Sequence, residues 1–295
     1  MRRRAAGGTA AFALALAAMA QPSIAEDLVE RGRYLTAAGG CISCHTADED
    51  GAAPFAGGRA LASDFGTFFG PNITPDRDTG IGAWSEADFL RAVLEGRSPS
   101  GAAYFPAFPY PSYAGLTEDD ARAIYAYLRT LPAVRRENLE HKLPWHVSRV
   151  GARIWQALYF SPTGFQRDPA RSETWNRGAY LVRHLGHCGE CHTPRNRLGA
   201  PEASRELSGN PQGPENRRIP NITPHDPDGI GGWSADEVVA FLEYGMLPDG
   251  DFAGAGMGEV IDENTGKLTA ADREAIAAYL LALPAVPDIK GSPDG

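Results

Sequence analysis

Apolar residues recur at helical spacing in two stretches of the chain that are separated by an offset of 152 residues. Each stretch follows a threonine, Thr117 or Thr269, whose hydroxyl can cap a helix N-terminus. Each ends at a proline, Pro132 or Pro284, which cannot continue a helix. We therefore predict two equivalent helices, whose apolar faces carry Ala121, Ile124, Tyr125 and Leu128 in one and Ile276, Tyr279, Leu280 and Leu283 in the other.

Other segments repeat at nearly the same offset, which makes the chain two copies of one module. The segment 71–75 recurs at 220–224, and 80–85 recurs at 229–234, both at an offset of 149 residues. Ser85 and Ser234 close the second segment, and each is expected to cap a further helix. The matching segments 31–35 and 177–181 predict a first helix in each copy.

The remaining segments set the predicted boundaries. Three arginines, an apolar run and small residues before position 26 have the layout of a cleaved secretory signal peptide, residues 1–25, rather than a membrane anchor, since a span needs about 20 apolar residues. We predict a first domain at 26–134, a linker at 135–174, a second domain at 175–288 and a disordered tail at 289–295.

The chain of 295 residues carries a net charge of −9, and loss of the N-terminal arginines would make it more negative. An acidic surface argues against nucleic acid and against anionic membranes as partners. An exported protein with four cysteines would ordinarily form disulfides. The spacing of the cysteines indicates a different use.

The four cysteines occur only in two CxxCH motifs, formed by Cys41, Cys44 and His45 and by Cys188, Cys191 and His192. This motif is typical of covalent haem attachment, in which two thioethers hold the porphyrin and the adjacent histidine is the proximal iron ligand. One alternative is a redox disulfide, which expects a βαβ context that is missing here, and the other is half of a zinc site, which would leave the two histidines unexplained. Two haem c groups are therefore expected, in a periplasmic protein.

On these motifs the chain resembles the di-haem class I cytochromes c, above all the cytochrome subunits of periplasmic alcohol, gluconate and aldehyde dehydrogenases. The resemblance implies an all-α fold of two tandem cytochrome c domains, with long Gly/Pro-rich loops packed around covalently bound haem. It also implies that the carbonyl groups of Pro71 and Pro220 accept hydrogen bonds from His45 and His192, which would orient the two rings.

The sixth iron ligands are expected to differ between the copies. The family places its axial methionine before the last helix, and Met257 lies there, so the resemblance implies Met257 rather than Met246 for the second haem. The repeat aligns Met257 with Phe108, which cannot coordinate iron. The first haem then has no sixth ligand, or a tyrosine from the aromatic stretch 104–113 (Tyr104, Tyr110 or Tyr113), or a linker histidine, His141 or His146.

The linker contains an apolar helical stripe of Val147, Val150, Ile154, Ala157 and Leu158. We expect this stripe to pack against the two domains. The alternative is a helix lying on a membrane surface, so membrane association is peripheral at most.

Two functions fit these features. The first is a non-catalytic electron carrier, or the cytochrome subunit of a dehydrogenase, that passes electrons from that dehydrogenase to a downstream cytochrome or oxidase. The second is a peroxidase-like or ligand-binding haem enzyme that uses an open first haem. The apolar stretch around Phe108 offers little of the polar assistance that a peroxidase needs, and no catalytic residue is assigned.

Overall fold

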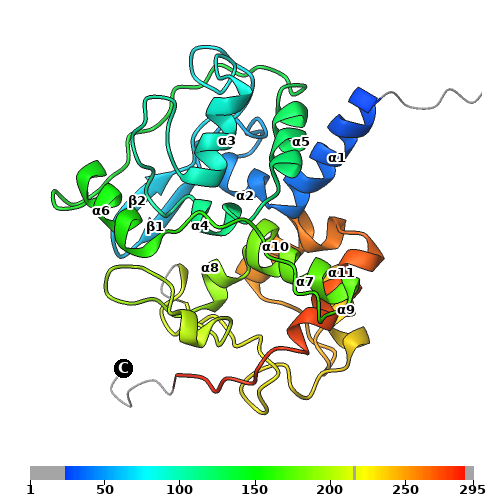
Figure 1. The fold of residues 1–295 in the computed structure, drawn as a ribbon. Helices are drawn as coiled ribbons and strands as arrows, with labels where there is room; N and C mark the ends of the chain where they lie inside the picture. Colours follow the sequence, from blue (N-terminus) through cyan, green and yellow to red (C-terminus); the bar gives the residue numbers. More distant parts are fainter. Residues whose placement is uncertain (1–23, 215–216, 290–295) are drawn as a thin grey trace, which may run out of the picture.

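The computed structural model describes residues 24–214 and 217–289. Residues 1–23 of the predicted signal peptide and 290–295 of the predicted tail lie outside this range. Figure 1 shows the first copy of the repeat, in blue to green, above the second copy, in yellow-green to red.

The first copy contains five helices and a pair of strands within the described residues: α1 (Ile24–Ala38), α2 (Cys41–His45), β1 (Ala60–Ser63), β2 (Gly66–Phe69), α3 (Glu86–Glu95), α4 (Tyr110–Tyr113) and α5 (Glu118–Leu128). The linker contributes α6 (Arg149–Tyr159). The second copy contains α7 (Glu173–Tyr180), which continues as the π-helical turn η1 (Leu181–Leu185), then α8 (Gly189–His192), η2 (Ala203–Arg205), α9 (Ala235–Tyr244), α10 (Ala255–Glu263), η4 (Thr265–Lys267) and α11 (Ala270–Leu280).

The predicted helix caps are confirmed in both copies. The Thr117 hydroxyl accepts the backbone N–H of Asp120, and the Thr269 hydroxyl accepts that of Asp272. Ser85 and Ser234 each form a complete capping box with the acidic residue three positions later. Local sequence therefore fixes where α3, α5, α9 and α11 begin.

The structure is mainly helical, consistent with the all-α prediction, and the first copy also contains one short antiparallel sheet. Strands β1 and β2 pair from Ala60 opposite Phe69 to Ser63 opposite Gly66. Gly66, the first residue of β2 after the turn, has a φ of 108°, a conformation that suits glycine. The linker adds a bridge on the far side of β2, where Thr67 and Lys142 exchange N–H···O bonds of 2.8 and 2.9 Å. These strands lie in a segment without helical periodicity, which is why the sequence did not predict them.

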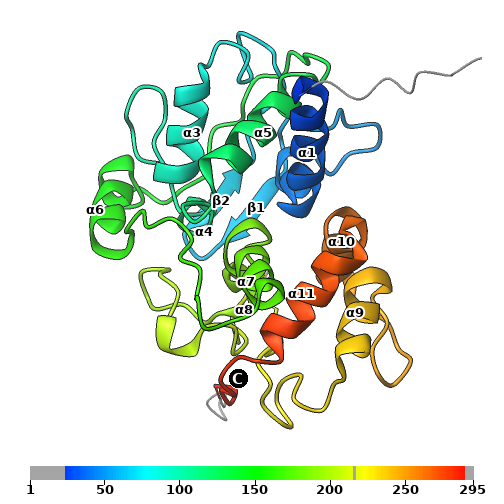
Figure 2. The ribbon, with the colours of Figure 1, turned by 45° about the vertical axis from the view of Figure 1, so that its right-hand side comes forward.

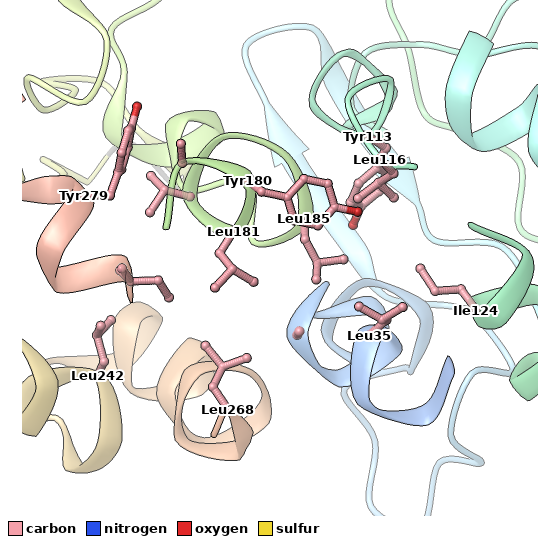
Figure 3. Packing of buried hydrophobic residues seen from close by; sticks show 14 of the residues in the cluster. Leu35, Tyr113, Leu116, Ile124, Tyr180, Leu181, Leu185, Leu242, Leu268 and Tyr279 are labelled. Atoms are coloured by element: carbon pink, nitrogen blue, oxygen red, sulfur yellow. The ribbon is translucent and has the colours of Figure 1, made fainter. Parts of the chain in front are cut away.

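One hydrophobic cluster runs through both copies. In the first copy α1 packs on α5, and in the second α7 packs on α11. Figure 3 shows Leu35 of α1 facing Leu181 and Leu185 of η1, so side chains from the two copies meet in one core. The copies therefore share apolar surface and do not merely sit at the ends of a linker.

The linker helix α6 turns most of the predicted stripe outward, although Val147, just before the helix, packs inward beside Ala152. Ala152, Trp155 and Gln156 are its buried residues. Val150, Ile154 and Leu158, which were expected to pack inward, are 70%, 57% and 65% exposed. The reason is that Trp155 donates its indole N–H to the Leu198 carbonyl and fills the interface, which turns the aliphatic stripe outward.

Within the described residues, no helix is both long enough and apolar enough to cross a membrane.

Candidate functional site

The two CxxCH segments form the short helices α2 and α8, each entered through a left-handed residue. Gly40 precedes Cys41 with a φ of 61°, and His187 precedes Cys188 with a φ of 41°. The cysteines are free thiols, with no disulfide among them. Burial raises the pKa of Cys41 and of Cys188 to about 12, because an apolar environment disfavours the thiolate. The thiols of Cys41 and Cys188 thus lie in apolar surroundings, which favour their neutral form.

The histidine of each motif is held by the carbonyl of a proline. His45 Nδ1 lies 2.7 Å from the Pro71 oxygen, and His192 Nδ1 lies 2.8 Å from the Pro220 oxygen, the contacts that the resemblance implies. Burial lowers the pKa of both rings, although the bond to the carbonyl opposes it. A neutral ring whose Nδ1 donates to a carbonyl presents the Nε2 lone pair, which is what an iron ligand requires.

The proline loops are fixed against the CxxCH segments by close packing. A Cβ at Gly70 would lie 1.7 Å from the Cys44 carbonyl oxygen, so only glycine fits there. The amide of Asn72 donates to the Val134 carbonyl over 2.7 Å. The amide of Asn221 donates over the same distance to the Val286 carbonyl. In each copy a neutral histidine, two free thiols and a loop that orients the histidine fit a covalently attached haem.

Met257 lies in the first turn of α10 and is partly buried. Helix α10 packs against α2, α9 and η4. Met246, the other methionine of this copy, is 43% exposed and lies in the hairpin that follows α9. Met257 is therefore the more enclosed of the two, and its assignment as an iron ligand stays a prediction.

Phe108 is the centre of an aromatic cluster in the first copy. Its ring lies 5.7 Å from that of Tyr104, 6.4 Å from Tyr110 and 5.8 Å from Tyr113. Tyr110 is fully buried and packs edge-on against Phe160, on the side of the linker. Among the three tyrosines Tyr113 lies near the first motif, and its hydroxyl donates to the Gly39 carbonyl over 3.0 Å. That bond commits the Tyr113 hydroxyl to the backbone.

The two linker histidines are placed elsewhere. His141 Nδ1 accepts the backbone N–H of Phe69 at 3.1 Å, two residues before Pro71 and thus on the side of the loop that holds the proximal histidine. Its other nitrogen then carries the proton, so the ring has no free lone pair for iron. The His146 ring packs edge-on against Trp145, which is 95% exposed. Neither geometry supports a linker histidine as the sixth ligand of the first haem.

The two CxxCH segments meet at the interface between the copies. A Cβ at Gly39 would lie 3.6 Å from both the Cys41 sulfur and a methyl group of Leu185. His187 Nε2 lies 3.2 Å from the Gly39 carbonyl oxygen. Burial raises the pKa of Cys191 to about 11, the Glu190 carboxylate adds to this, and a smaller electrostatic coupling to Cys44 reflects how close the two motifs lie. Two haem groups attached at the two motifs would therefore lie on either side of the interface between the copies.

A pair of crossed hydrogen bonds joins the copies, and sequence reasoning missed it. The Tyr34 hydroxyl donates to Asp272 of the other copy over 2.6 Å. The Tyr180 hydroxyl donates to Asp120 over 2.5 Å. Each aspartate also binds the arginine of its own copy, Arg31 or Arg177. The repeated segments 31–35 and 177–181 contained the signal, but the sequence alone did not reveal that the tyrosines cross over.

Comparison with known proteins identifies relatives of this chain. The family profile of cytochrome c matches residues 29–132. A di-haem cytochrome c-type protein of Cereibacter sphaeroides is 45% identical over 87% of this chain and 86% of its own length. The gluconate 2-dehydrogenase cytochrome c subunit of Pantoea cypripedii is 39% identical over 92% of this chain and 63% of its own length. The fructose dehydrogenase cytochrome subunit of Gluconobacter japonicus is 39% identical over 87% of this chain and 53% of its own length. The chain thus spans little more than half the length of some relatives.

Proposed function

Because the chain belongs to the cytochrome c family, we propose that it is a periplasmic di-haem cytochrome that carries electrons from a dehydrogenase to a downstream acceptor. One observation carries this proposal. The two CxxCH segments, each with its histidine anchored to a proline carbonyl, meet at a single interface between the copies. Two redox groups held so close together suit transfer of electrons from one to the other.

The proposal assigns the residues as follows. Cys41, Cys44, Cys188 and Cys191 attach two haem c groups, and His45 and His192 are the proximal ligands. Haem supplies reversible one-electron chemistry at iron, and the protein supplies ligation, burial and orientation. Pro71 and Pro220 fix the ring orientation of the two histidines. Met257 is proposed as the sixth ligand in the second copy.

In the first copy we propose that the aromatic cluster around Phe108 covers the distal side and that no side chain ligates the iron. The apolar lining and the committed Tyr113 hydroxyl disfavour peroxidase-like chemistry, which needs polar groups beside the iron. The electron carrier is therefore favoured over the haem enzyme.

The same proposal covers domains, location and partner. Residues 26–134 and 175–288 form two tandem cytochrome c domains joined by the linker 135–174. The segment 1–25 is a signal peptide that directs the protein to the periplasm. Relatives that are cytochrome subunits of gluconate and fructose dehydrogenases support a dehydrogenase as the electron donor.

The test begins with the purified protein and a haem assay. Two haems per chain are expected, and any other number contradicts the proposal. Met257→Ala should abolish the methionine–ferric iron charge-transfer band, whereas the matched variant Met246→Ala should keep it. The reverse pattern would show that the ligand is Met246. Carbon monoxide should bind one of the two reduced haems rapidly, as expected for an iron that no side chain ligates in the sixth position in the first copy.

We also propose that any membrane association is peripheral and occurs through α6. Its exposed stripe of Val150, Ile154 and Leu158 lies in the segment 141–167, which contains four basic residues and no acidic ones. The segment is therefore basic although the chain as a whole is acidic, and this local composition suits a helix that lies on an anionic lipid surface. Flotation with vesicles that contain phosphatidylglycerol should carry the protein upward, and Ile154→Glu should prevent this. Phe252→Glu, at a position of similar exposure in the second copy, is the matched control.

A further inference from the structure

The hairpin that follows α9 has an exact structural counterpart after α3. Helices α3 and α9 end at Gly96 and Gly245, both left-handed. The chain then turns back through a bridge between Arg97 and Ala103 in the first copy and between Met246 and Phe252 in the second. In the first copy the backbone N–H of Tyr104 donates to the Gly96 carbonyl, and in the second the N–H of Ala253 donates to the Gly245 carbonyl, both over 2.8 Å. The two hairpins can therefore be compared position by position.

In the first copy, α6 covers this hairpin. Ala103 is 4% exposed and packs with Ala152 of α6. Arg149 of α6 donates to the Ala103 carbonyl over 3.0 Å, and the Gln156 amide donates to the Glu95 carbonyl over 2.9 Å. The cover thus combines apolar contact with a cation and an amide that satisfy backbone carbonyls.

In the second copy the equivalent surface is bare. Phe252, at the position of Ala103, is 61% exposed, and Tyr244 and Met246 are 65% and 43% exposed. Figure 2 shows α6 near α3 in the first copy, and α9 at the edge of the second copy. Large apolar side chains have replaced small or polar ones at the place where the other copy buries its hairpin.

The charge of this region indicates what would cover it. Residues 219–266 contain ten acidic side chains and no lysine or arginine. Asp249 and Asp251 are exposed at the hairpin tip, where the first copy has Ser100 and Ala102. Their carboxylates accept only backbone N–H groups of their own loop among the hydrogen bonds of the described residues. The exposed apolar residues therefore lie beside the unpaired charges of Asp249 and Asp251. Such a surface fits a partner whose own apolar contact residues are ringed by basic side chains.

We propose that Tyr244, Met246, Phe252, Asp249 and Asp251 form the docking surface for a basic electron-transfer protein. This rests on the proposed function, because Met257 follows Phe252 by five residues and docking here brings the partner to the second haem. The first copy cannot use the same surface, because α6 occupies it. Electrons therefore leave, or enter, through the second copy.

A lysine-rich mitochondrial-type cytochrome c is the probe, with both proteins ferric so that binding is measured without electron transfer. Isothermal titration calorimetry at low ionic strength should show binding that weakens about 5- to 10-fold in Asp249→Asn/Asp251→Asn, since asparagine keeps the acceptor oxygen and loses the charge. Phe252→Ser should weaken it about 5-fold. The matched control is Asp50→Asn/Asp64→Asn, which removes two exposed acidic residues from the first copy and should change affinity less than about 2-fold.

Stopped-flow reduction of the same probe by the reduced protein should follow the binding data and slow with added salt. The inference is overturned if the wild type does not bind the probe, if Phe252→Ser has no effect, or if the control pair weakens binding as much as the hairpin pair. The haem content and reversible reduction of each sample are measured alongside. Two haems that reduce normally with unaltered binding would refute this surface alone, whereas a missing haem would refute the proposed function.

Discussion

Removal of the Tyr180 hydroxyl should destabilise the protein more than removal of the Tyr34 hydroxyl, although the repeat makes the two residues equivalent. Tyr180 is 5% exposed and donates to Asp120 Oδ2 over 2.5 Å. Arg31 binds only the other carboxylate oxygen, Oδ1. In the second pair, Arg177 reaches both oxygens of Asp272, so Oδ2 keeps a donor when Tyr34 loses its hydroxyl.

The magnitudes follow from what each substitution leaves behind. Tyr180→Phe removes a hydrogen bond to a charged group and leaves a buried carboxylate oxygen without a donor, which costs about 2–3 kcal/mol. Tyr34→Phe removes a similar bond but leaves Asp272 paired, so we expect about 1 kcal/mol. Burial, with the charge of Asp120 adding to it, raises the pKa of Tyr180, so its hydroxyl remains a donor across the accessible pH range.

The assay is guanidinium unfolding of the haem-loaded protein, followed by circular dichroism. Tyr244→Phe, at an exposed position, is the control and should change the free energy of unfolding by less than about 0.5 kcal/mol. A double-mutant cycle of Tyr180→Phe with Asp120→Asn should give a coupling energy of about 1–2 kcal/mol. If Tyr180→Phe costs no more than Tyr34→Phe, the asymmetry read from the two carboxylates is wrong.

Three further changes test the frame of the site. Gly70→Ala should lower the yield of haem-loaded protein severely, as measured by haem absorbance per chain, because its Cβ would overlap the Cys44 carbonyl. Asn221→Ala should cost about 2 kcal/mol in denaturant unfolding, since its side chain bridges two loop segments; a loss below 0.5 kcal/mol would contradict this. Burial would raise the pKa of Asp272, but hydrogen bonds from Arg177 and Tyr34 lower it below its ordinary value. The ionised carboxylate therefore stabilises the fold above about pH 4, and this stabilisation is lost as the pH falls through the lowered pKa of the folded state. The destabilisation by Asp272→Asn should thus be full at pH 7 and shrink in acid; a pH-independent difference would refute it.

The sequence predicted those features that depend on local chemistry. The caps at Thr117 and Thr269 lie where a hydroxyl precedes an acid-rich turn, and the structure confirms them. The repeat also predicted that each copy would build the same helices. These predictions succeed because capping and helical periodicity involve residues within one or two turns of each other.

Features that depend on contacts distant in sequence were not predictable. Tyr34 and Asp272 are 238 residues apart, and nothing in either segment shows that the tyrosine crosses to the other copy. The stripe on α6 was assigned to packing because apolar faces usually pack inward. Trp155, with one polar atom and a large ring, decided the orientation instead. The short sheet at β1 and β2 was missed because its strands have only four residues each.

The duplication explains how the two sites stay together while they differ. The tyrosine–aspartate pairs occur once in each direction, so each copy needs the other to complete its hydrogen bonds. The copies nevertheless diverge, with Phe108 aligned to Met257 and with a hairpin that α6 covers in one copy and leaves bare in the other. In the proposed electron carrier, a shared centre would keep the two redox groups close together, and two unlike faces would separate the entry of electrons from their exit.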